Sequence, residues 1–156
     1  MKKILLSLCL ILCISLQNGL AQEPKHEFRA TWLATVANID WPETKATDAT
    51  TRNQQKKELT DIFDKMVAGN MNAVCMQVRS LCDAMYQSSY EPWSVALTGT
   101  RGKDPGYDPL AFAIEEAHKR GLELHVWVNP FRASKGDLAN TDLVWKNASD
   151  WLIKYN

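Results

Sequence analysis

Hydrophobic and polar positions follow two different spacings along the chain, and these predict strands and helices in turn. Phe28 to Val36, Ala73 to Arg79 and Leu122 to Asn129 are rich in apolar, β-branched and aromatic residues, as buried strands are. Between them, apolar residues recur at helical spacing in Thr51 to Ala68 and after Asp108. The order strand, helix, strand, helix, strand predicts right-handed crossovers and a parallel sheet.

The first predicted helix has start and stop signals. Thr51 and Gln54 fit a capping box at its start, and Gly69 or Asn70 ends it. Its expected buried face consists of residues that recur at helical spacing: Leu59, Ile62, Phe63, Met66 and Val67.

The second predicted helix follows a long loop, Ser80 to Tyr107. Asp108 is its expected N-cap, Pro109 stands at its first position, and Gly121 follows its end. Its apolar stripe comprises Leu110, Ile114 and Ala117, flanked by Phe112 and Ala113. A further helical stretch is expected near Leu143 to Tyr155.

Residues two apart share one face of a strand, which separates apolar from polar positions. The apolar faces, expected to pack under helices, are Val74, Met76 and Val78 in the second strand and Leu122, Leu124, Val126 and Val128 in the third. The opposite faces hold Cys75, Gln77 and Arg79, and Glu123, His125, Trp127 and Asn129. Arg79 and Asn129 therefore stand at carboxyl ends of strands, where parallel α/β folds bind ligands. The alternative is that they only satisfy loop backbones.

The first 21 residues predict a secretory signal peptide. Lys2 and Lys3 precede an apolar run from Ile4 to Leu16, and Gly19-Leu20-Ala21 supplies small residues for a cleavage site. The run is too short to span a bilayer, and the alternative is a buried core helix. We expect cleavage after Ala21, export to the periplasm or beyond, and no stable membrane anchor afterwards.

Charge and cysteine content narrow the function classes. Eighteen basic residues balance eighteen acidic ones, which argues against a nucleic-acid partner. Cys75 and Cys82 remain after cleavage and could pair in an oxidising compartment, which the sequence leaves open. There is no CxxC and no zinc-type or calcium-type ligand spacing, so we expect neither a metal nor a cofactor.

The loops after the three strands combine aromatic, acidic and amide side chains. They hold Asn38, Asp40 and Trp41, then Asp83, Tyr86, Glu91 and Trp93, and finally Phe131 and Arg132. A sugar site uses such residues, because the C–H face of a pyranose packs on a ring and its hydroxyls need planar hydrogen-bonding partners. The same rings are also typical of a loop core.

Nine stretches occur in a fixed order through Arg132: Glu27 to Leu33, Asn38 to Pro42, Gln77 to Arg79, Asp83 to Ser88, Glu91 to Ser94, Leu97 to Gly99, Tyr107 to Leu110, Glu116 to Gly121 and His125 to Arg132. As an ordered set they resemble the bacterial glycosyl-hydrolase-like family 10. One departure is Arg79-Ser80-Leu81-Cys82-Asp83, where the family pattern usually reads Arg-Pro-x-Gly-Asp. Without Pro and Gly, the sequence does not predict which turn precedes Asp83.

The resemblance implies an α/β fold in which residues 22–156 form the first three strand–helix units of a (β/α)8 TIM barrel. A complete barrel needs about 250 residues, so this one is incomplete. It also implies a secreted glycoside hydrolase that acts on cell-envelope glycans such as peptidoglycan, or on other glycans. Such enzymes need two facing carboxylates. The resemblance implies that these lie on the fourth and later strands, so the catalytic residues are expected beyond Asn156 and residues 22–156 should be inactive.

The expected substrate-binding residues are Asp40, Gln77, Arg79, Asp83, Tyr86, Trp93, His125, Asn129 and Arg132. Asp40, Asp83 and Glu91 are the acids near the expected binding edge, in substrate-orienting or structural roles. His125 would contact either substrate or barrel neighbours.

Two rival functions stay open on the sequence. One is an exported, non-catalytic carbohydrate-binding or scaffold α/β domain. The other is an exported α/β protein that binds a small polar ligand and has no affinity for oligosaccharides.

Overall fold

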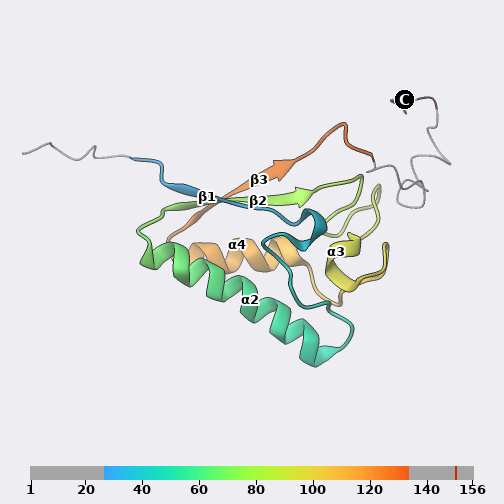
Figure 1. Cartoon of the computed structure of the whole chain (residues 1–156), viewed down its shortest axis with the longest axis horizontal. Helices are drawn as coiled ribbons and strands as arrows, with labels where there is room; N and C mark the ends of the chain where they lie inside the picture. The colour runs from blue at the N-terminus through green and yellow to red at the C-terminus, as the bar shows by residue number, and fades with distance from the viewer. Residues whose placement is uncertain (1–26, 134–149, 151–156) are drawn as a thin grey trace, which may run out of the picture.

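The computed structural model describes residues 27–133 and Asp150 (Figure 1). Its elements are β1 (Ala30–Leu33), the 3-10 turn η1 (Val36–Asn38), α2 (Ala49–Ala68), β2 (Ala73–Arg79), α3 (Val95–Thr98), α4 (Pro109–Lys119) and β3 (Glu123–Val128). The strands form one parallel sheet in the order β1-β2-β3. Helices α2 and α4 lie on one side of it (Figure 1). The predicted alternation and parallel sheet are confirmed, while their assignment to the first three units of a (β/α)8 barrel stays an expectation.

The start of α2 corrects the predicted cap. Asp48, three residues before Thr51, is the N-cap, and its carboxylate accepts a hydrogen bond from Thr51 N at 2.8 Å. The Thr51 hydroxyl accepts one in return from Asp48 N at 3.0 Å. A capping carboxylate accepts from helix-end N–H groups better than a threonine hydroxyl does, which favours the earlier start. The helix ends at Gly69, as expected, and Asn70 takes a positive φ of 58°.

The core lies between helices α2 and α4 and the face of the sheet that they cover. Leu59, Phe63 and Met66 of α2 are buried there, together with Val74 and Met76 of β2. The prediction was wrong for Val67, which is exposed. It lies about 100° from Met66 and about 40° from Phe63 around the helix, which puts it at the margin of the core-facing stripe.

Strand β1 is shorter than predicted because its continuation bonds to side chains. Ala34 N donates to the Asp40 carboxylate at 2.7 Å, and Thr35 N donates to Gln77 Oε1 at 3.1 Å. These bonds draw the chain out of the ladder after Leu33 and into η1.

Strand β3 departs from the prediction on its apolar face. Leu122 is buried and Leu124 is partly buried, but Val126 and Val128 are exposed. β3 is the edge strand of the described sheet, and α2 and α4 leave its second half uncovered.

Helix α4 has the predicted ends and a slightly rotated stripe. The Asp108 carboxylate accepts from Ala111 N at 2.9 Å, Pro109 begins the helix, and Gly121 has a φ of 72°. Ala113 and Ala117 face the core, whereas Ile114, placed in the stripe by the sequence, is exposed. Two small residues on this face let the helix approach the sheet closely.

The long loop after β2 contains a helix that the sequence analysis missed. α3 has only four residues, too few to show a helical period, and is capped by the Ser94 hydroxyl and Gly99. The stretch predicted near Leu143 to Tyr155 lies outside the described residues. Within residues 27–133, no helix is both long and apolar enough to cross a bilayer.

Substitutions on α2 test this packing. Phe63→Ala should lower the free energy of unfolding by about 3–5 kcal/mol, because it removes a fully buried ring. Val67→Ala, one turn further along the helix at the exposed margin of the stripe, should change it by less than about 0.5 kcal/mol. Urea unfolding followed by circular dichroism measures both; equal effects would contradict the assigned face.

Candidate functional site

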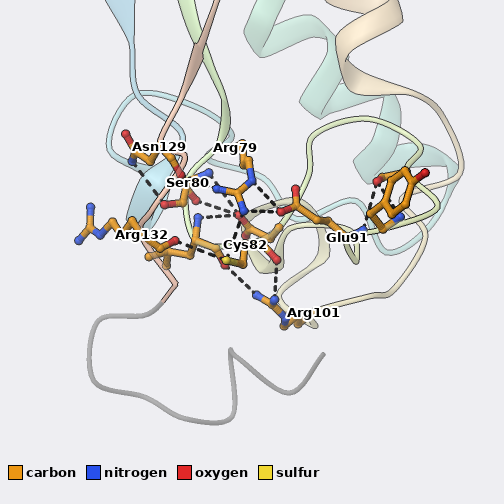
Figure 2. A network of polar contacts seen from close by, with 11 residues as sticks. Arg79, Ser80, Cys82, Glu91, Arg101, Asn129 and Arg132 are labelled. Atoms are coloured by element: carbon orange, nitrogen blue, oxygen red, sulfur yellow. Dashed lines mark hydrogen bonds and ion pairs between the residues drawn. The ribbon is translucent and has the colours of Figure 1, made fainter. Parts of the chain in front are cut away.

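The carboxyl ends of the three strands meet the three following loops at one edge of the sheet, which we call the rim. The rim comprises residues 34–48 after β1, 80–108 after β2 and 129–133 after β3. Figure 2 shows the polar network that joins two of these loops around Arg79. The sequence analysis placed the candidate site at this edge.

Arg79, the last residue of β2, is the centre of the network. Its Nε donates to Glu91 Oε1 at 2.6 Å, and its Nη2 lies 2.5 Å from the same oxygen. Its Nη1 donates to the Asn129 carbonyl, and its Nη2 also contacts Cys82 Sγ at 3.3 Å. The side chains of Arg79 and Glu91 are only 15% and 18% exposed. The guanidinium is therefore engaged by the protein and ties the end of β2 to the exit of β3.

Asp83 holds the turn that follows Arg79. The side chain is buried, and its Oδ1 accepts from Leu81 N at 2.9 Å, from Ser80 N at 3.3 Å and from the Ser80 hydroxyl at 3.2 Å. Cys82 in this turn has a φ of 49°, which suits the glycine that the resemblance implies there. Asp83 Oδ2 is buried with no hydrogen-bond partner among the described residues.

Gln77 fixes the loop after β1. It is fully buried, and its Oε1 accepts from Val36 N at 2.8 Å as well as from Thr35 N. The Thr35 hydroxyl donates to the Gln77 carbonyl at 3.0 Å. Gln77 Nε2 has no partner within the part of the chain that is described. The Gln77 side chain therefore holds the backbone of the loop after β1.

Asn129 and Asp40 also bond within the protein. Asn129 Oδ1 accepts from Trp127 Nε1 at 2.9 Å, and Asn129 Nδ2 donates to the Ser80 carbonyl at 3.3 Å. Asp40 is exposed, and one of its oxygens accepts from Ala34 N.

The remaining predicted site residues lie apart from the network or at its margin. Tyr86 and Trp93 are partly buried and pack against the core. His125 lies four residues before Asn129, on the sheet face away from the helices, where it meets Glu123 at 3.2 Å and the Phe28 ring edge-to-face. Arg132 is exposed, and its carbonyl accepts from the Cys82 thiol at 3.7 Å.

Sequence reasoning missed Gln55, a buried amide that joins two rim loops from below. Its Nε2 donates to the carbonyls of Thr44 at 2.7 Å and Leu97 at 3.0 Å. Its Oε1 accepts from the Tyr107 hydroxyl at 2.6 Å, and its carbonyl accepts from Trp41 Nε1 at 3.0 Å. The available signal was its position, one turn before Leu59 on the apolar face of α2.

No metal-ligating arrangement appears in the described ranges. They contain no group of three or more His, Cys, Asp or Glu side chains placed to hold an ion. Cys75 and Cys82 are both free thiols in this structure.

A shallow hollow of about 460 Å³ lies at the opposite end of β3 from the rim, lined by His118, Gly121, Leu122, Glu123, Leu124 and His125. Parallel α/β folds bind ligands at the carboxyl ends of strands, so the rim is the stronger candidate.

Comparisons with known proteins agree with the resemblance. The glycosyl hydrolase-like 10 family matches residues 27–155. The glycosyl hydrolase YngK of Bacillus subtilis (strain 168) is 51% identical over 133 residues, which cover 83% of this chain and 26% of YngK. The glycosyl hydrolase DigH of Escherichia coli (strain K12) is 39% identical over 117 residues, which cover 72% of this chain and 27% of DigH. The chain thus spans about a quarter of the length of these relatives.

Among solved structures, an alpha-L-fucosidase of family GH29 from Bacteroides thetaiotaomicron is similar at 10% identity with a TM-score of 0.40, covering 78% of this chain and 33% of that one.

Glu91→Gln tests the ion pair in the rim network. The substitution leaves Arg79 mostly buried without its countercharge, so the free energy of unfolding should fall by about 2–4 kcal/mol. Glu115→Gln breaks the exposed pair with Lys119 on α4 and should cost less than about 0.5 kcal/mol. Urea unfolding compares the two variants; equal costs would contradict a structural role for the pair.

Tyr107 makes a pH-dependent contribution to the free energy of unfolding. Burial, with a smaller contribution from Glu58, raises the pKa of the Tyr107 phenol above its ordinary value. In the unfolded chain a tyrosine ionises near pH ~10, so stability is present below that pH and is lost as the pH rises further. This contributes a loss of up to ~1.4 kcal/mol per pH unit above the unfolded pKa.

Tyr107→Phe should remove this contribution. The variant loses the bond to Gln55 and is less stable than wild type near neutral pH, by about 1 kcal/mol. The gap should narrow between pH 9 and pH 11, as measured by urea unfolding at each pH. Parallel curves for the two proteins would contradict this role for the phenol.

Proposed function

Because this chain belongs to the glycosyl hydrolase-like 10 family, we propose that it is part of an exported glycoside hydrolase. The reaction is hydrolysis of O-glycosyl bonds, and the substrates are cell-envelope glycans such as peptidoglycan, or other glycans. Two relatives that carry the name glycosyl hydrolase support this proposal. The observation that carries it is the rim, where polar and aromatic residues from three loops gather at the carboxyl ends of parallel strands.

The three acids that the sequence analysis placed near the binding edge make structural bonds. Asp40 accepts from Ala34 N, Asp83 Oδ1 accepts three hydrogen bonds, and Glu91 pairs with Arg79. A glycosidase of the usual kind needs one carboxylic acid that protonates the leaving oxygen and one carboxylate on the other side of the bond. We therefore propose that the rim binds the glycan. We also propose that residues 22–156 alone do not hydrolyse it.

Export is part of the same proposal. Residues 1–21 have the charged start, apolar run and small-residue end of a secretory signal, and cleavage after Ala21 would leave Gln22 first. Export would bring the protein to glycans of the cell envelope.

The second candidate is an exported domain that binds glycan without cleaving it. The structural bonds of Asp40, Asp83 and Glu91 support it, since each of these acids already holds part of the rim.

A hydrolysis assay tests the proposal. The native protein isolated from its host should release new reducing ends from purified peptidoglycan glycan strands or another polysaccharide, while residues 22–156 produced alone should release none. Intact mass and N-terminal sequencing of the native protein establish its length and whether it begins at Gln22.

Each outcome of this assay decides between the candidates. Hydrolysis by residues 22–156 would contradict their inactivity and give Asp40, Asp83 or Glu91 a catalytic role. Binding of glycan by the native protein without hydrolysis favours the second candidate. A native protein that neither binds nor cleaves any glycan contradicts both.

A further inference from the structure

Among the described residues, each of the three rim loops exposes one large apolar side chain. Ile39 after β1 is 67% exposed, Tyr90 after β2 is 90% exposed, and Phe131 after β3 is 96% exposed. A single exposed apolar residue needs no explanation, but these three occur in different loops at the same end of the sheet. The two aromatic side chains among them are the most exposed of the large apolar residues described.

The backbone that carries Tyr90 is fixed. The Ser88 hydroxyl accepts from Tyr90 N and from Glu91 N, each at 3.1 Å. Glu91, the next residue, is held by the Arg79 guanidinium. The exposed ring therefore stands on a rigid loop.

The backbone that carries Phe131 is fixed on both sides. Asn129 N donates to the Arg79 carbonyl at 3.0 Å, and the Asn129 carbonyl accepts from the Arg79 guanidinium. On the other side, the Arg132 carbonyl accepts from the Cys82 thiol. The Arg79 guanidinium thus bonds Glu91, the residue after Tyr90, and the carbonyl of Asn129, two residues before Phe131 (Figure 2).

Rings in this setting suit a ligand with a flat apolar face. An exposed aromatic side chain loses little conformational entropy on binding, and its ring offers a large apolar area. The polar side chains of the network, Arg79 and Asn129, are bonded within the protein and serve as support. Tyr86 and Trp93 are partly buried against the core and leave less ring face free.

We propose that Tyr90 and Phe131 are the stacking platforms for pyranose rings of the bound glycan, and that the Arg79 network holds the two platforms in place. This inference rests on the proposed function. The matching sugar is a β-gluco-configured pyranoside, including N-acetylglucosamine, because its equatorial substituents leave flat C–H faces. An axial hydroxyl, as in mannose, interrupts that face.

Binding of defined glycans to the native full-length protein tests the inference. The probes are chitohexaose and peptidoglycan glycan strands, with α-mannan as the axial-hydroxyl comparison, measured by calorimetry and by pull-down of insoluble glycan. Tyr90→Ala and Phe131→Ala should each weaken binding of the β-linked probes by about 5- to 30-fold, as expected for aromatic anchors. Tyr90→Phe and Phe131→Tyr keep the rings and should bind within about twofold of wild type.

Val67→Ala, on the helix side of the molecule, is the matched surface control and should bind as wild type does. Since Tyr90 and Phe131 are exposed, their alanine variants should keep the wild-type unfolding temperature. A marked fall in that temperature would show that the rings pack within the protein and would overturn the inference.

The remaining outcomes separate the inference from the proposed function. If both alanine variants bind as wild type does, the inference that Tyr90 and Phe131 stack on the glycan is overturned and the proposed function stands. Tighter binding of α-mannan than of the β-linked probes has the same consequence. If the wild-type protein binds and cleaves no glycan, the proposed function fails and the inference fails with it.

Discussion

One guanidinium sets the geometry of the rim. Arg79 ends the central strand, and a positive charge in this mostly buried position needs a countercharge and acceptors for its N–H groups. Glu91 supplies the charge, and the Asn129 carbonyl supplies an acceptor from the neighbouring strand. Satisfying Arg79 therefore folds the loop after β2 back over the strand ends and fixes where the chain leaves β3.

Two buried amides extend the same principle to the other loops. A loop that lies against the body of a protein must find partners for its backbone N–H and C=O groups, because water cannot reach all of them. Gln77 accepts from two N–H groups of the loop after β1, and Gln55 donates to carbonyls of two different loops. An amide suits this task because it carries a donor and an acceptor on one flat group. Several polar side chains at the rim therefore use their hydrogen bonds to hold the loops in place.

The sequence predicted the parts of the fold that depend on local signals. β2 has its predicted bounds, and α4 has its predicted cap and stop, because a Pro after a capping Asp and a Gly past the helix end act within a few residues. The short β1 and the exposed second half of β3 depend on neighbours distant in sequence, and local pattern misses them. The edge that carries the candidate site was predictable from strand periodicity. The partners of its side chains were not, because Gln77 meets Thr35 across 42 positions and Arg79 meets Asn129 across 50.

The turn at Cys82 has the backbone conformation of a glycine turn, although the residue is not glycine. The residue holds a left-handed backbone conformation that costs a non-glycine residue about 1–2 kcal/mol. The side chain offsets part of that cost, since its sulfur accepts from Arg79 and donates to the Arg132 carbonyl. The turn brings the Ser80 and Leu81 N–H groups onto the Asp83 carboxylate, and Arg101 bonds the Leu81 and Cys82 carbonyls from outside. A sequence that lacks the expected glycine still adopts the conformation glycine favours, so the turn is imposed by the network around it.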